Sequence, residues 1–254
     1  MARPLRIEYA DAYYHVMNRG RGRQFIFHGD DYYLSYLTCL EEAHRRFGLV
    51  VHAYCLMGNH YHLLVSTPRG NLGRAMRHVN GQYTQRYNRM KRTDGPLFRG
   101  RYRALLIDAA GYLLQVSRYI HRNPIETDRP LVRYLADYRW SSYPAYINRA
   151  EVPDWLCRDM VLGEPGTAHR YAAYRRYVDE EVDEETQRFY RGPAVIMGDK
   201  TFAEQARAKA LSSDREISRG VSMGRVEPEE IIREVAVAFA CAKEEIYRAR
   251  RGRG

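Results

Sequence analysis

The chain has 254 residues, 45% of them hydrophobic, which is enough for one large domain or for one domain with an extension. Its net charge of +10 favours a polyanionic partner, and no apolar run approaches membrane-spanning length. The four cysteines form no CxxC pair, so neither a zinc ribbon nor a disulfide framework is indicated. The first residues do not form a signal peptide, and we expect a cytoplasmic protein.

The positive charge is concentrated in the first part of the chain. Residues 1–150 carry 23 Lys and Arg against 11 Asp and Glu, a balance of +12. Residues 151–254 carry 18 against 20, a balance of −2. Between residues 43 and 107 there are 12 basic residues and one acidic residue, Asp94. A bias this concentrated favours nucleic acid as the partner over a merely soluble surface.

The first predicted elements are a strand at 12–17, a basic turn at 18–23 and a long helix that ends at about Phe47. Asp30 or Asp31 is expected to cap this helix, and Gly48 to end it. The helical period predicts four apolar side chains on its buried face: Leu34, Leu37, Leu40 and Ala43.

A β-hairpin is predicted next. Leu49–Met57 forms a buried strand, Gly58-Asn59 the turn, and 60–66 the returning strand. Because side chains alternate along a strand, His60 and His62 point to one side, roughly 6–7 Å apart, and can bind one divalent metal. The other seven histidines have no partner at ligand spacing and are interpreted as structural or surface residues: His15, His28, His44, His52, His78, His121 and His169.

A second long helix is expected from the cap Asn71 to about Met90, followed by a break at Gly95-Pro96 and a strand over 101–107. Four of its arginines are expected to point outward: Arg74, Arg77, Arg86 and Arg89. The order strand, helix, strand, strand, helix, strand predicts an α+β protein with a ferredoxin-like α/β sandwich, an antiparallel sheet with helices on one face.

A third helix is predicted from the cap Asp108 to Arg122, with Pro124 as its stop. Its apolar stripe docks it on the sheet: Leu113, Val116 and Ile120. Tyr119 and Asn123 lie four residues apart and therefore share one face near the end of the helix. Arg118 and Arg122 flank them and are candidates for holding phosphate or lowering the pKa of the tyrosine, and Tyr112 is the substitute candidate for Tyr119.

Helices are also expected beyond residue 148. An aromatic segment at 134–147 is predicted to pack, and the acidic run 179–185 to form a solvated face or linker. Residues 199–211 are expected to form a helix. Two short helices at 228–250 are typical of the beginning of a helix-turn-helix, which is incomplete at the end of this sequence.

Three motifs, MGNHYHLLV, LFRGRYRALLID and YLLQVSRYIHRNP, resemble in this order the single-tyrosine His-hydrophobic-His transposases, and within them the REP-associated tyrosine transposases. The resemblance covers about 5–148 and implies a transposase or nuclease domain at 1–148, followed by a helical extension over 149–254 that ends in the incomplete helix-turn-helix, about 226–254. It also implies that a divalent metal, Mg²⁺ or Mn²⁺, is held by His60, His62 and Asn123, and that Tyr119 is the nucleophile. Some relatives have Gln in place of the asparagine.

The first hypothesis is therefore a metal-dependent transposase that cuts and rejoins single-stranded, hairpin-forming repeat DNA through a 5′-phosphotyrosine. A monomer is favoured over a homodimer. The arginines expected to contact the DNA are Arg19, Arg21, Arg23, Arg74, Arg77, Arg86, Arg99, Arg101, Arg103, Arg118 and Arg122. Two alternatives stay open: a non-catalytic protein that binds structured repeat DNA or RNA with a vestigial metal site, and a metal-dependent hydrolase that uses water as the nucleophile.

Overall fold

The computed structural model describes residues 7–163, 169–192 and 195–222. The helix-turn-helix expected at 226–254 lies outside these residues. The chain divides into two compact units between Ala210 and Leu211, and the sheet and candidate site belong to the first. Within the described ranges, no helix combines the length and the apolar character needed to cross a membrane.

A five-stranded sheet forms the centre of the first unit, with the strand order β2-β3-β1-β4-β5. The pairs β1/β3, β1/β4 and β2/β3 are antiparallel, whereas β4 and β5 run parallel. The order of the first four strands, with α1 after β1 and α2 after β3, confirms the predicted ferredoxin-like fold. The strands are β1 (Ala12–Arg19), β2 (Val50–Met57), β3 (His60–Thr67), β4 (Arg103–Ile107) and β5 (Ile196–Met197).

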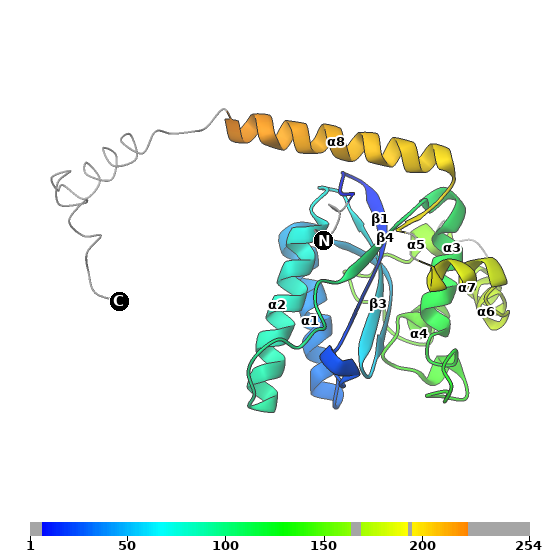
Figure 1. Cartoon of the computed structure of the whole chain (residues 1–254). Coiled ribbons are helices and arrows are strands. Elements are labelled where there is room, and N and C mark those ends of the chain that lie inside the picture. The colour runs from blue at the N-terminus through cyan, green and yellow to red at the C-terminus, as the bar shows by residue number, and fades with distance from the viewer. Residues whose placement is uncertain (1–6, 164–168, 193–194, 223–254) are drawn as a thin grey trace, which may run out of the picture. The chain divides into compact units, whose positions relative to one another are not determined.

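The prediction of an antiparallel sheet with helices on one face is wrong in two respects: helices cover both faces (Figure 1), and β5 adds a parallel strand. Two long helices, α1 (Asp30–Phe47) and α2 (Leu72–Lys91), pack on one face, as the ferredoxin-like core requires, and α3 (Ala109–Arg122) covers the other. Alternation along the strands supplies both layers. In β1, Tyr14 and Val16 join the core under α1 and α2, whereas Tyr13 packs in the core under α3.

The remaining elements are short, apart from the last helix. The predicted aromatic packing segment is confirmed, because Tyr143 and Tyr146 are fully buried and pack with Tyr174. The elements are η1 (Arg21–Arg23), η2 (Leu135–Asp137), α4 (Tyr143–Tyr146), α5 (Asp159–Leu162), α6 (Arg170–Asp179), α7 (Glu184–Arg191) and α8 (Lys200–Ser222).

Three details of the predicted elements are wrong. Gly29, not Asp30 or Asp31, is the N-cap of α1. Both aspartates lie in the first turn, where their negative charges interact favourably with the positive end of the helix dipole. Leu34 is 52% exposed. It lies about 160° around the helix from Tyr36, which marks the buried face. The fourth strand begins at Arg103 rather than two residues earlier.

Residues beyond 148 pack against the same sheet. Val51 of β2 forms a bridge with Leu156, and Leu106 of β4 pairs with Ile196 of β5. The first compact unit therefore continues past residue 148. The domain boundary expected there stays a prediction about where the transposase domain ends.

Candidate active site

The hairpin between β2 and β3 presents two histidines at one end of the sheet. Met57 pairs with His60, which leaves Gly58-Asn59 as the two-residue turn. The rings of His60 and His62 lie with their centroids 5.1 Å apart. Tyr61 points to the opposite face, where its hydroxyl donates to Asn80 Oδ1 at 2.9 Å. The predicted alternation of these three side chains is confirmed.

Hydrogen bonds engage the Nδ1 atom of each histidine, and Nε2 of each has no partner among the described residues. His60 Nδ1 lies 2.6 Å from Asn59 Oδ1, and His62 Nδ1 lies 2.9 Å from His15 Nε2. Burial, helped by Arg19, lowers the pKa of His60 to about 4. Burial, with His60 and His15 nearby, lowers the pKa of His62 well below its ordinary value. Both imidazoles are therefore uncharged at neutral pH, the form in which histidine binds a metal.

Helix α3 brings Tyr119 to the same face as His62. The helix begins as predicted, with the Asp108 carboxylate accepting a hydrogen bond from Ala110 N at 3.2 Å. Its predicted apolar stripe is buried against the sheet. The centroid of the Tyr119 ring is 5.9 Å from that of His62. Tyr112, seven residues earlier, makes no ring contact with a histidine in the described part of the chain.

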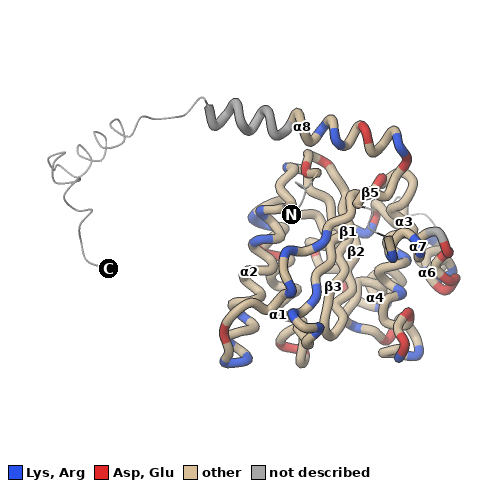
Figure 2. Tube along the Cα trace, in the orientation of Figure 1, with Lys and Arg blue, Asp and Glu red and all other residues tan. Residues whose placement is uncertain are grey.

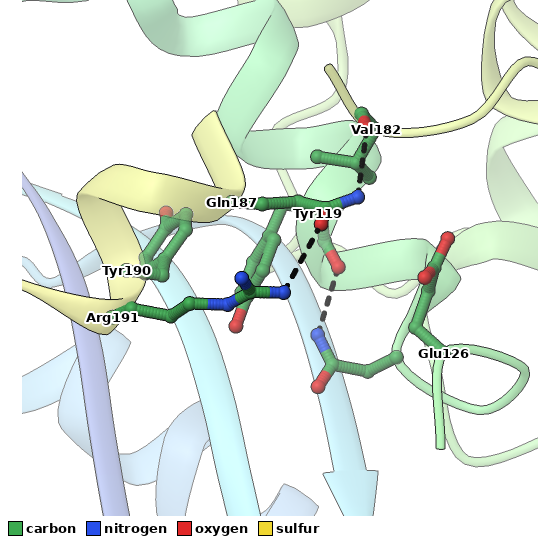
Figure 3. Close-up of a pocket in the computed structure, with 7 residues that line it drawn as sticks. Tyr119, Glu126, Val182, Gln187, Tyr190 and Arg191 are labelled. Atoms are coloured by element: carbon green, nitrogen blue, oxygen red, sulfur yellow. Dashed lines mark hydrogen bonds between the residues drawn. The ribbon is translucent and has the colours of Figure 1, made fainter. Parts of the chain in front are cut away.

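Asn123 follows Tyr119 at the end of α3. Its Nδ2 donates to the Tyr119 carbonyl oxygen at 2.8 Å, which fixes the orientation of the carboxamide. Its Oδ1 has no hydrogen-bond partner among the described residues and can act as an oxygen ligand. Tyr119, Asn123 and Tyr190 together line a pocket of about 280 Å³ (Figure 3).

Helix α7 supplies the opposite wall of this pocket (Figure 3). The ring of Tyr190 stacks on that of Tyr119, with centroids 3.7 Å apart and planes inclined by 13°. Burial raises the pKa of Tyr119, whereas the positive charges of Arg103 and Arg19 act to lower it. The residues that pull this pKa down are thus different from the predicted Arg118 and Arg122.

Exposed arginines border the histidine end of the sheet. We call Arg19, Arg21, Arg23, Arg99 and Arg101 the arginine rim; all five are exposed. Backbone hydrogen bonds hold its two loops beside the hairpin turn, since Gly20 N donates to Asn59 O at 2.9 Å and Arg99 N to Arg19 O at 2.9 Å. Figure 2 shows basic segments around β1 and β3 and an acidic group at α6.

Several of the predicted DNA-binding arginines are already engaged within the chain. Arg118 is buried and binds Asp183 at 2.9 Å. Arg122 is buried and binds Glu126 at 2.7 Å. These two guanidinium groups therefore join α3 to the following segments and are not free for phosphate. Two more have partners: Arg86 binds Glu42, and Arg103 donates to Gly192 O at 3.0 Å. Two others are exposed on α2: Arg74 and Arg77.

The sequence model of the family described as "Transposase IS200 like" matches residues 8–123. These are the residues that build the four-stranded core, the histidine pair, Tyr119 and Asn123. Residues 8–123 are an IS200-like transposase domain. Transposases of this family process DNA. The match confirms the resemblance inferred from the three motifs.

The solved structure of a REP-associated tyrosine transposase bound to a REP hairpin has a similar fold, with a TM-score of 0.51 and 15% identity. The similarity covers 63% of this chain and 93% of that one. A protein of Deinococcus radiodurans described as a transposase matches with a TM-score of 0.34 and 19% identity, over 48% of this chain and 97% of that one. The second similarity is too low to support a conclusion about the fold. No curated protein matches the chain.

The candidate donor atoms suit a divalent cation by their chemistry, although the pocket lined by Asn123 does not include His60 or His62. They are Nε2 of His60, Nε2 of His62 and Oδ1 of Asn123, none of which has a hydrogen-bond partner among the described residues. The described chain contains no group of three or more His, Cys, Asp or Glu side chains placed to hold a metal, so an amide or substrate oxygen is needed to complete the shell. Mixed nitrogen and oxygen ligands suit Mn²⁺ or Mg²⁺.

Two residues of the candidate site escaped the sequence reasoning. His15 was interpreted as structural or as a surface residue, yet it lies in contact with His62. The sequence predicted that His15 lies on a strand. It did not predict that His62 is its neighbour, because this contact depends on the pairing of β1 with β3 in the folded sheet. Tyr190 carries no local signal, since it lies 71 residues after Tyr119 and reaches it only through the packing of α7.

Proposed function

We propose that this protein is a metal-dependent transposase that cleaves and rejoins single-stranded, hairpin-forming repeat DNA through a covalent bond to Tyr119. The observation that supports it is the placement of the Tyr119 ring 5.9 Å from the His62 ring on one face of the sheet. This arrangement places the ring of the proposed nucleophile beside one of the two neutral imidazoles, close to where a cation and an anionic phosphate would meet.

The proposed substrate is a DNA single strand that continues into a hairpin. The arginine rim lies at the end of the sheet where the hairpin turn presents His60, and exposed arginines bind phosphates without reading the bases. The fold is also similar to that of a transposase solved with a REP hairpin. We propose that Arg74 and Arg77, exposed on α2, extend this basic surface. A monomeric state stays a prediction.

In the proposed reaction the Tyr119 hydroxyl oxygen attacks the scissile phosphorus. The bond from phosphorus to the 3′ oxygen of the preceding nucleotide breaks, which leaves a free 3′-hydroxyl and a 5′-phosphotyrosyl bond. Because the new ester retains the energy of the broken one, a 3′-hydroxyl can rejoin the strand by the reverse attack. A divalent cation held by His60, His62 and Asn123 would polarise a non-bridging phosphate oxygen, and the imidazoles favour Mn²⁺ over Mg²⁺.

The phenol loses its proton during this attack, and the leaving 3′ oxygen gains one to become the free hydroxyl, so the step balances. Burial raises the pKa of Tyr119, so the resting side chain is protonated at neutral pH. Arg103 and Arg19 oppose this effect and stabilise the negative charge that develops on the phenol oxygen. Asn123 has a second role in this proposal, because its bond to the Tyr119 carbonyl holds the end of α3 in place.

The test is covalent capture of labelled DNA. The protein is incubated with end-labelled hairpin oligonucleotides that carry a single-stranded flank, with Mn²⁺, and the products are separated under denaturing conditions. We expect a label-bearing protein band with the native protein and none with Tyr119→Phe.

Tyr112→Phe is the matched control, since Tyr112 lies on the same helix without contact to the histidines. It should retain the adduct. Adducts formed equally by Tyr119→Phe would reject Tyr119 as the nucleophile. Chelator-insensitive hairpin binding without cleavage in any metal would favour a binding protein instead.

A further inference from the structure

A chain of hydrogen bonds leads from α7 to the candidate metal ligand His62. The Tyr190 hydroxyl lies 2.7 Å from His15 Nδ1. The other ring nitrogen of His15, Nε2, lies 2.9 Å from His62 Nδ1. His15 is completely buried, and His62 is 6% exposed. The two polar atoms of the His15 ring are therefore both engaged, one with the hydroxyl and one with the imidazole.

Each contact in this chain needs one donor and one acceptor, which links the proton positions of the three side chains. A neutral imidazole carries a proton on only one of its nitrogens. If His62 is to offer a bare Nε2 to a cation, its proton must lie on Nδ1. His62 Nδ1 then donates to His15 Nε2, and His15 must carry its own proton on Nδ1. That proton can only be donated to the oxygen of Tyr190.

The opposite arrangement blocks the ligand. If His15 carries its proton on Nε2, it donates to His62 Nδ1, and His62 must then carry its proton on Nε2. In that state the nitrogen facing the candidate site is no longer a lone-pair donor. The Tyr190 hydroxyl completes the chain in either arrangement, since it accepts from His15 Nδ1 in the first and donates to it in the second, and a cation at His62 Nε2 selects the first.

We propose that Tyr190 and His15 are positioning residues that hold the ring orientation of His62 for metal binding and keep its Nδ1 partnered in the tautomer that a cation selects. This inference rests on the proposed function, in which His62 is a ligand. Partners of this kind, which hold the second nitrogen of a ligating histidine, are a general requirement of metal sites. His60 has a simpler partner, because the Asn59 side-chain oxygen accepts from its Nδ1 at 2.6 Å.

The geometry also excludes His15 as a third metal ligand in this arrangement. Its Nε2 is the atom that contacts His62, and its Nδ1 is occupied by Tyr190. The described residues contain no cluster of three or more side chains of the usual ligand types. Arg103 holds the end of α7 by donating to Gly192 O at 3.0 Å, which keeps Tyr190 over the site.

The test uses Tyr190→Phe in the full chain, because this change removes only the hydroxyl oxygen and keeps the ring stacked on Tyr119. Calorimetric titration with Mn²⁺ alone reports affinity. In Tyr190→Phe we expect an Mn²⁺ affinity about 10- to 100-fold weaker, because His15 Nδ1 then has no acceptor for the proton that the metal-bound arrangement places on it.

Tyr174→Phe is the matched control. The Tyr174 hydroxyl lies 2.7 Å from His121 Nδ1, so this change breaks a Tyr–His contact of the same length away from His62. It also removes the hydrogen bond that the Tyr174 hydroxyl donates to Ser117 Oγ at 2.9 Å, and it should leave the Mn²⁺ affinity unchanged. An equal loss of affinity in Tyr174→Phe and Tyr190→Phe would attribute the effect to general destabilisation and overturn the inference.

His15→Gln supplies a second, independent test. A glutamine oxygen can accept from His62 Nδ1 without help from Tyr190, so Tyr190→Phe should cost no further Mn²⁺ affinity in the His15→Gln background. An equal cost in both backgrounds would overturn the inference. Failure of the native protein to bind Mn²⁺ would instead overturn the proposed function.

Discussion

His52 should make the fold sensitive to acid. It lies in β2 at a shift of register between Val51 and Ala53, is 1% exposed and has partners on both ring nitrogens. Nδ1 donates to Cys157 O at 3.2 Å, and Nε2 accepts from Ser66 Oγ at 2.9 Å. A protonated ring would reverse the second of these bonds, with Nε2 donating to Ser66 Oγ, and would place a charge in the core.

The size of the effect follows from the pKa of this group. Burial lowers the pKa of His52 from its ordinary value of 6.5 to about 4. The unfolded chain therefore takes up a proton first as the pH falls, and the folded state only near pH 4. The stabilisation is complete above pH 6.5 and is lost progressively below it. The full difference is about 3 kcal/mol, and about 2 kcal/mol of this is lost by about pH 5.

The assay is equilibrium unfolding in urea at about pH 7.5 and at about pH 5, on the native protein and on His52→Gln. Glutamine keeps polar atoms at the site but cannot titrate. The variant should be less stable at the higher pH, yet its free energy of unfolding should fall by about 2 kcal/mol less on acidification. The other buried histidines titrate in both proteins and cancel in this comparison. Equal losses on acidification would refute the reasoning.

Three further predictions concern the candidate site. Asn59→Ala removes the acceptor that holds His60 Nδ1 and should weaken Mn²⁺ binding about 10-fold by calorimetry; unchanged affinity would show that Asn59 does not position this ring. Arg118→Met removes the ion pair with the half-exposed Asp183 and should lower the free energy of unfolding by about 1–2 kcal/mol. The salt dependence of hairpin binding should not change, and a reduced salt slope would instead identify Arg118 as a DNA contact. Arg101→Gln should weaken hairpin binding at every sequence and reduce the logarithmic salt slope by about 0.7, measured by fluorescence anisotropy, whereas a sequence-dependent loss would indicate base readout instead.

Local sequence patterns were sufficient to predict several elements of this protein and the placement of its histidine pair. The hairpin with Gly58-Asn59 as its turn, the alternation of His60 and His62, and the helix that begins at Asp108 all depend on neighbours within a few residues. Such short-range rules act in any tertiary context. The one-turn spacing of Tyr119 and Asn123 belongs to the same class, and the structure places both in a common pocket.

The tertiary structure decided which charges are free and which rings meet. Arg118 and Arg101 look alike in the sequence, yet Arg118 is buried against Asp183 and Arg101 lies exposed on the arginine rim. Nothing local distinguishes them, because the partner lies 65 residues away.

The neighbours of His62 are the clearest case. His15 reaches it through the pairing of β1 with β3, and Tyr190 reaches His15 through the packing of α7 against the sheet. The sequence by itself determined the elements and the two histidines, since these follow from backbone geometry and side-chain period. Only the tertiary structure determined what holds those histidines, since hydrogen bonds between distant segments depend on sheet order and helix packing that no local pattern encodes.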